Sequence, residues 1–157
     1  MSSPLKSPGP RYGALLQILR TAEVLWESSR VFFARWDLST SQFNILNLLR
    51  GYPDGASQTE LSRELIMHRS NVTGLVDRLE KRGLVKRTSD PGDRRVHRVK
   101  LTREGKSIMA KVLPEYYGAA EDVLGKLTPT AAGRLAKSLN EISQQAHAVA
   151  NQSETKR

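Results

Sequence analysis

The stretch that decides the fold is residues 57–101, SQTELSRELIMHRSNVTGLVDRLEKRGLVKRTSDPGDRRVHRVKL. It begins with Ser57 and, three residues later, Glu60, a capping-box pattern in which each side chain bonds the other's free backbone amide at a helix start. After this short helix a second should follow and end at Gly83, because apolar residues recur there at the i, i+3, i+4, i+7 spacing of one helix face. These apolar residues are Val72, Leu75, Val76 and Leu79.

A short β-hairpin is expected after the second helix. Residues 84–87 and 96–101 have the composition of strands, and the turn sequence Asp90-Pro91-Gly92-Asp93 lies between them. Two short helices that lead into a basic hairpin predict a winged helix-turn-helix. In such a module the second helix, called the recognition helix, enters the major groove of DNA.

Helices are also expected on both sides of this module. Apolar spacing and capping residues predict four of them, over residues 12–36, 39–49, 102–126 and 128–151. Their apolar stripes are larger than the small module can cover, so they should pack between two copies of the chain. The alternative, in which they fold back within one chain, stays open.

The expected fold class is therefore mainly α with a small β-wing: a winged helix-turn-helix flanked by N- and C-terminal dimerisation helices. Residues 1–10, rich in proline and serine, should form a flexible arm. Residues 11–36 and 102–150 should form the helical dimerisation region, and residues 37–101 the DNA-binding domain.

The charge distribution favours a polyanionic partner. The chain carries a formal net charge of +9, and residues 78–106 hold eleven basic but only four acidic side chains. There is no cysteine, no apolar run of membrane-spanning length and no histidine cluster with metal-ligand spacing. We therefore expect a cytoplasmic protein that needs no cofactor, no metal and no membrane partner.

The residues expected to contact DNA come from three places. Asn71 and its polar neighbours lie off the apolar face of the recognition helix, where asparagine suits adenine and threonine suits the thymine methyl group. Short polar residues that start the preceding helix should hold phosphate, and arginines at the hairpin tip suit a narrow minor groove. The full set is Gln58, Thr59, Arg69, Ser70, Asn71, Thr73, Arg78, Arg87, Asp93, Arg94 and Arg95.

Within the hairpin tip, Asp93 should pair with Arg95, because a carboxylate that faced phosphate alone would oppose binding. A plain surface ion pair is the alternative for these two residues. For the recognition helix, the alternative is that its polar residues are simply an ordinary solvated face.

Several segments together resemble the MarR family of bacterial transcription regulators. They are the wing sequence Asp93-Arg94-Arg95, the returning strand Val99-Lys100-Leu101-Thr102, residues 76–87 and residues 57–62. The resemblance extends over about residues 15–142. It implies an obligate homodimer held by its terminal helices, with each winged module on one half of an inverted-repeat operator. By position, Asp93 and Arg95 match the family's wing acid and minor-groove arginine, and residues 69–73 match the start of its recognition helix.

The family usually represses transcription until a small ligand or an oxidant releases it. Oxidant sensing through a thiol is excluded here, because the chain has no cysteine. The resemblance also allows a small aromatic or phenolic ligand, and Trp26, Phe33 and Trp36, with Arg30 or Arg35 holding a carboxylate, are the expected contacts. Packing within the core or the dimer is the alternative role for these aromatic rings.

The function expected from the sequence is thus a homodimeric, ligand-responsive repressor that binds double-stranded DNA. A transcriptional activator of the same fold and a winged-helix module that binds protein remain as alternatives. An enzyme is not expected, since neither a nucleophile motif nor a phosphate-cradling glycine loop is present.

Overall fold

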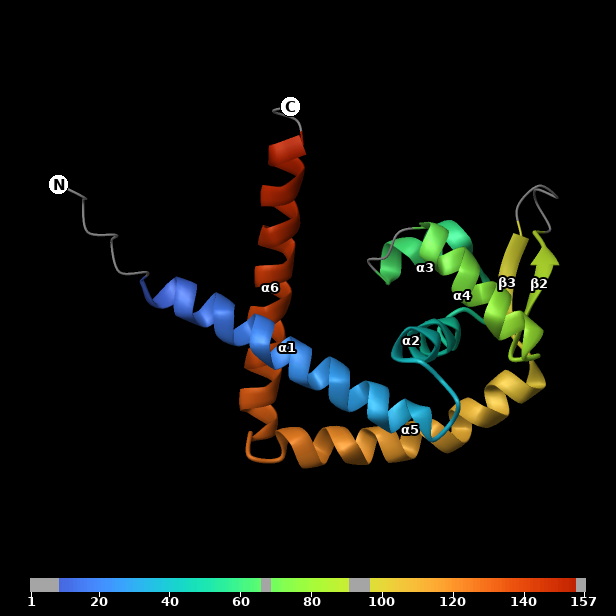
Figure 1. Cartoon of the computed structure of the whole chain (residues 1–157), viewed down its shortest axis with the longest axis horizontal. Helices are drawn as coiled ribbons and strands as arrows, with labels where there is room; N and C mark the ends of the chain where they lie inside the picture. The colour runs from blue at the N-terminus through green and yellow to red at the C-terminus, as the bar shows by residue number, and fades with distance from the viewer. Residues whose placement is uncertain (1–8, 66–68, 91–96, 155–157) are drawn as a thin grey trace. The chain divides into compact units, whose positions relative to one another are not determined.

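The computed structural model describes residues 9–65, 69–90 and 97–154 (Figure 1). The chain divides into two compact units, Met1–Ala110 and Lys111–Arg157. The first unit contains α1 (Pro10–Ala34), α2 (Thr40–Leu49), β1 (Ala56–Ser57), α3 (Gln58–Glu64), α4 (Arg69–Lys81), β2 (Val85–Ser89) and β3 (His97–Leu101). Helix α5 (Arg103–Leu124) begins in the first unit, and the second unit also contains α6 (Pro129–Glu154). The predicted class, mainly α with a small β-wing, is confirmed.

The sheet has three antiparallel strands in the order β1-β3-β2. Strands β2 and β3 form the predicted hairpin, with Val85 opposite Leu101 and Ser89 opposite His97. Strand β1 was not predicted, because two residues are too few for a periodic signal; its Ala56 lies opposite Val99.

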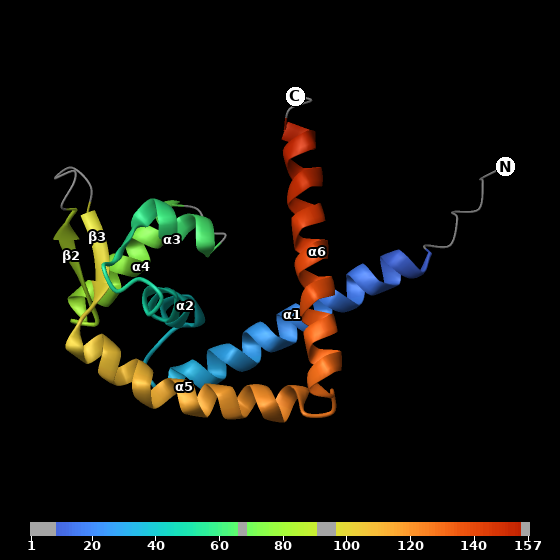
Figure 2. The same ribbon diagram turned by 180° about the vertical axis from the view of Figure 1, so that it is seen from behind.

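The core of the first unit lies between α2, α4 and the sheet. Leu46 on α2, Val76 on α4 and Val99 on β3 are all fully buried, and these elements contact one another. The other apolar residues of the predicted α4 face, Val72, Leu75 and Leu79, are buried as well. In Figures 1 and 2, α3 lies beside α4, and the hairpin lies beside α4.

The predicted helix ends depend on local hydrogen bonds that the structure contains. Ser39 with Gln42 and Ser57 with Glu60 both form complete capping boxes. Helix α4 ends in a Schellman motif, in which Gly83 has φ +69° and donates its N–H to the Glu80 carbonyl, while the next N–H reaches the Leu79 carbonyl. Leu84 supplies that second N–H, so β2 starts one residue later than predicted.

Helices α1 and α5 differ slightly from their predicted bounds. Helix α1 begins at Pro10, two residues before the predicted start, because proline is well suited to the first helical position. It ends at Ala34, since Asp37 has φ +52°, and Trp36 therefore lies in the turn that follows. Helix α5 ends at Leu124, two residues before the predicted end.

In the second unit, Thr128 caps α6 as predicted: its Oγ1 accepts from the N–H of Ala131 at 3.2 Å. Along α6, Leu135, Leu139 and Ile142 are exposed on the predicted stripe. Within the described part of the chain, no helix is both long and apolar enough to cross a membrane.

Candidate nucleic-acid interface

Helices α3 and α4 are joined by a hydrogen bond between two of the predicted contact residues. The Thr73 hydroxyl on α4 donates to Oε1 of Gln58, the first residue of α3, at 2.7 Å. Both side chains are half-buried. Because the bond occupies the amide oxygen, the Gln58 side chain is held with its NH₂ group as the remaining donor.

The outward side of α4 carries the predicted polar residues. Asn71 and Arg78 are exposed, and Thr59 is exposed on α3. At Gly74 an added Cβ would meet nothing nearer than the Arg78 guanidinium at 3.7 Å. This part of α4 therefore has a polar, accessible surface on which no side chain projects at Gly74.

Arg69 and Ser70 form the first turn of α4, but their side chains lie outside the described residues. The wing residues Asp93, Arg94 and Arg95 also lie outside them. The predicted pairing of Asp93 with Arg95 therefore stays a prediction.

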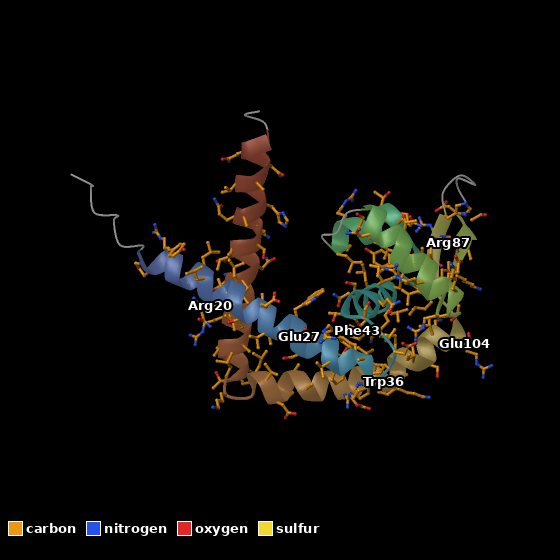
Figure 3. The ribbon with its side chains drawn as sticks, viewed as in Figure 1. Arg20, Glu27, Trp36, Phe43, Arg87 and Glu104 are labelled. Carbon is orange, nitrogen blue, oxygen red and sulfur yellow. The ribbon has the colours of Figure 1, made fainter. Side chains whose placement is uncertain are left out.

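Arg87 on β2 is bound to α4 (Figure 3). Its Nη2 donates to Oδ1 of Asp77 at 2.5 Å, and its Nη1 donates to Oε2 of Glu80. The backbone N–H of Arg87 also reaches Glu80 Oε1 at 2.9 Å. The guanidinium thus has two carboxylate partners within the protein, which the sequence-based assignment of Arg87 to DNA did not anticipate.

The ion pairs at Arg87 are only partly exposed. The Arg87 side chain is 24% exposed, whereas those of Asp77 and Glu80 are 49% and 36% exposed. Burial works to lower the pKa of Arg87, but the hydrogen bonds that its guanidinium donates to Asp77 and Glu80 outweigh this effect and raise that pKa above its ordinary value. Arg87 is therefore a permanent cation, and its single charge offsets half of the charge of the two acids on α4.

Arg98 on β3 joins the turn end of the hairpin to the loop before β1. Its Nε donates to Oδ2 of Asp90, its Nη1 donates to the Gly55 carbonyl at 2.9 Å, and Nη1 lies 3.9 Å from Oε2 of Glu60. The hydrogen bond with Asp90 is the main cause that raises the pKa of Arg98. Sequence reasoning counted Arg98 only as positive charge, because its place opposite Ser57 depends on the unpredicted strand β1.

The four predicted ligand residues do not form one exposed set. Phe33 is fully buried and stacks on Phe43 with ring centroids 4.1 Å apart, so it belongs to the core. Trp26 is 51% exposed on α1. Arg30, one turn further along, is paired with Glu27 through hydrogen bonds of 2.8 and 2.5 Å.

Trp36 differs from the other three, because it lies in the turn between α1 and α2. Its indole Nε1 is buried without a hydrogen-bond partner, as is the hydroxyl of Thr40 at the start of α2.

Over the part of the chain that the structure describes, no group of three acidic, histidine or cysteine residues could hold a metal ion.

A family model described as the MarR family matches residues 36–96. Over 100 residues the chain is 33% identical to the transcriptional regulator HosA of Escherichia coli O111:H-, a match that covers 60% of this chain and 73% of HosA. It is 34% identical over 94 residues to the HTH-type transcriptional regulator PecS of Dickeya dadantii (strain 3937), covering 59% of this chain and 57% of PecS. The chain thus spans little more than half the length of PecS.

The crystal structure of CouR from Rhodococcus jostii RHA1, bound to p-coumaroyl-CoA, has a similar fold. Its TM-score is 0.76 and its sequence identity 25%, with 88% of this chain and 95% of CouR covered. The structural likeness therefore includes the helices on both sides of the segment that the family model matches.

Proposed function

The chain belongs to the MarR family of transcriptional regulators, and we propose that it works as a homodimeric repressor that binds an inverted-repeat operator. The observation that carries the proposal is the arrangement of α3 and α4. The buried stripe of α4 faces the core, while Asn71 and Arg78 are exposed on its other side. An exposed polar helix beside a basic hairpin suits major-groove recognition.

Each residue would have a defined role on DNA. Asn71 would contact a base edge, and Arg78 with Thr59 would contact phosphates on either side. Gln58 would donate its NH₂ group to phosphate while Thr73 holds its oxygen. Arg69 and Ser70 would extend this surface at the start of α4, and Arg94 and Arg95 would enter the minor groove, with Asp93 orienting Arg95.

The experiment that tests this proposal is selection of bound sequences from a random duplex pool at several salt concentrations. We expect an inverted repeat whose half-sites lie about one helical turn, ~34 Å, apart. Asn71→Ala should then weaken binding to the selected site by about 1–3 kcal/mol and relax the preference at one base pair. Absence of binding even at low salt would overturn the proposal and favour a module that binds protein.

Repression, rather than activation, is tested with a reporter placed behind the selected operator. Expression of the regulator should lower reporter output, and the Asn71→Ala variant should lower it less. An increase in output would favour the activator alternative.

A small aromatic ligand is proposed to release the operator. The buried N–H of Trp36 and hydroxyl of Thr40, neither of which has a hydrogen-bond partner, support this idea, because a polar group of a ligand could satisfy one of them. Trp26 and Arg30 lie on the surface of α1, and Phe33 would act through packing alone. CouR, which binds p-coumaroyl-CoA, supplies the first compound to test.

That test follows the anisotropy of labelled operator while p-coumaroyl-CoA or its free acid is added. We expect release, and we expect Trp36→Phe, which removes the N–H but keeps an aromatic ring, to need more ligand for the same release. Release that is identical in both proteins would remove Trp36 from the ligand site, and no release by either compound would reject this ligand class.

A further inference from the structure

Helix α4 carries two acidic residues on the edge that includes Thr73, whose hydrogen-bond partner Gln58 is a proposed phosphate contact. Asp77 lies one turn after Thr73, and Glu80 lies one turn after Asp77, so the three residues follow the i, i+4, i+7 spacing of one helix edge. Both carboxylates are at least a third exposed. Double-stranded DNA carries one negative charge for about every 1.7 Å of its axis, so bare carboxylates in this row would repel it.

Arg87 reaches this row from the neighbouring strand. Its two guanidinium nitrogens bind one carboxylate each, and its backbone N–H holds Glu80 in addition. We propose that Arg87 is a positioning and charge-masking residue of the DNA-binding surface: it offsets part of the negative charge of Asp77 and Glu80 so that α4 can approach DNA, and it does not itself contact phosphate. This inference rests on the proposed function and assigns Arg87 a role different from the one its charge suggests.

The geometry favours masking over a phosphate contact. Asp77 and Glu80 each accept a charge-assisted hydrogen bond from the guanidinium, and such bonds, among the stronger polar interactions in proteins, hold the Arg87 side chain against α4. If the guanidinium moved from α4 to a phosphate, both acids would face the phosphate backbone unpaired. A cation that stays in place lowers the repulsion along the whole row, and because arginine does not titrate in the physiological range, this masking is independent of pH.

A double-mutant cycle on operator affinity tests the proposal. Its variants are Arg87→Ala, the pair Asp77→Asn with Glu80→Gln, and all three changes together. The amide replacements keep an oxygen acceptor at each position, including the one for the Arg87 backbone N–H, while removing the charge.

Masking predicts strong coupling between these changes. Arg87→Ala alone should weaken operator binding by about tenfold through like-charge repulsion. In the Asp77→Asn, Glu80→Gln background the same change should cost less than about twofold, because no charge remains to be masked. An equal loss in both backgrounds would overturn the proposal, since it is the result expected of a direct phosphate contact.

Two further measurements separate masking from a purely structural role. The neutral pair with Arg87 intact should bind the operator more tightly than the unaltered protein, whereas a structural role predicts weaker binding because the two ion pairs are lost. Glu104→Gln is the charge control, since it removes one negative charge from an exposed residue on α5 rather than on α4; Glu104 and Arg87 are labelled in Figure 3. When Glu104→Gln is combined with Arg87→Ala, the tenfold loss of operator affinity should remain. If Glu104→Gln restored the affinity, the loss would be explained by the net charge of the protein alone, and the proposal would be overturned.

Thermal unfolding of every variant confirms that each is folded at the temperature of the assay. The outcomes also separate this inference from the function it rests on. If the unaltered protein binds no operator, the proposed function fails; if it binds and the cycle is additive, only the role of Arg87 fails.

Discussion

Asp37 shows how one residue sets the end of a helix at a conformational cost. It has φ +52°, and in the described part of the chain it is the only residue other than glycine in the left-handed region. Its N–H bonds the Ala34 carbonyl, and the Leu38 N–H bonds the Phe33 carbonyl, which completes a Schellman turn after α1. Arg82, the residue after α4, donates to the Asp37 carbonyl and lies 3.1 Å from the Asp37 carboxylate.

Three substitutions at Asp37 separate the backbone cost from the ion pair. Asp37→Gly should be about 1 kcal/mol more stable than Asp37→Ala, because alanine meets the full steric penalty of the left-handed region and glycine does not. Asp37→Asn, which tolerates this backbone but lacks the charge, should lose less than about 1 kcal/mol, since the Asp37 side chain is 93% exposed. Urea unfolding measures all three, and equal stability of the alanine and glycine variants would contradict the turn assignment.

Glu60 makes the stability of the first unit depend on pH. The backbone hydrogen bond from Ser57 is the main cause that lowers the pKa of Glu60 below its ordinary value of 4.5, with the Ser57 side chain next. A carboxylate whose pKa is lower in the folded state stabilises the fold above the unfolded pKa, and this stabilisation is lost as pH falls through the folded pKa.

Glu60→Gln should therefore be less stable than the unaltered protein at pH 7, by about 0.3–1 kcal/mol, the usual value of an acid in the first turn of a helix. The difference should shrink as the pH is lowered from about 5 toward 3. Thermal unfolding across this range measures it, with Glu64→Gln as the control for loss of a carboxylate from the same helix. A difference that is constant with pH would show that the Glu60 charge does not contribute.

At the scale of elements, the start of α5 packs closely against Gly83 and Leu84, which form the turn after α4. The Thr102 hydroxyl donates to the Gly83 carbonyl at 2.6 Å and accepts from the Gly105 N–H at 3.0 Å, so one side chain caps α5 and ties it to that turn. A Cβ at Gly105 would lie 2.0 Å from the Leu84 carbonyl oxygen. Only glycine allows this approach.

Gly105→Ala should consequently destabilise the protein by about 1–3 kcal/mol, as overpacked sites do. Helix propensity alone predicts the opposite sign, because alanine is favoured over glycine inside a helix by about 1 kcal/mol. Gly118→Ala in the same helix is the matched control, since its Cβ would meet nothing within 4 Å. Urea unfolding of the two variants should give opposite shifts, and stabilisation by both would reject the close contact.

Helices and their caps could be predicted from the sequence because their signals are local. The Ser57 and Glu60 box, the α4 apolar face and the Gly83 turn each depend on residues a few positions apart. Strand β1 could not be predicted, since two residues form a strand only by pairing with β3. The charge-rich window correctly predicted a basic region, but it could not show that Arg87 and Arg98 are paired with acids, because those contacts cross between elements.

At the scale of the whole molecule, each of the two units exposes apolar side chains along a terminal helix. On α6, Leu135, Leu139, Ile142 and Val149 lie on one face and are 38–53% exposed. On α1, Leu15 and Leu19, also one turn apart, are 48% and 58% exposed. Apolar stripes of this length are typical of surfaces that are buried between subunits, which supports the homodimer of the proposed function.

Leu139→Glu tests this interpretation, because it places a charge at the middle of the α6 face while leaving the buried core of the first unit unchanged. Light scattering after gel filtration should give about twice the chain mass of 17.5 kDa for the unaltered protein and a single-chain mass for the variant. Lys137→Glu, exposed on the other side of α6, is the control and should remain dimeric.

The same variant links assembly to DNA binding. Two half-sites are bound tightly only when the two winged modules are joined, because the second module then acts at a high effective concentration. Leu139→Glu should therefore lose affinity for the full inverted repeat by at least about a hundredfold while binding a single half-site as weakly as the unaltered protein does. A dimeric Leu139→Glu variant, or a monomeric one with unchanged affinity for the full operator, would show that the α6 face does not hold the dimer that reads the DNA.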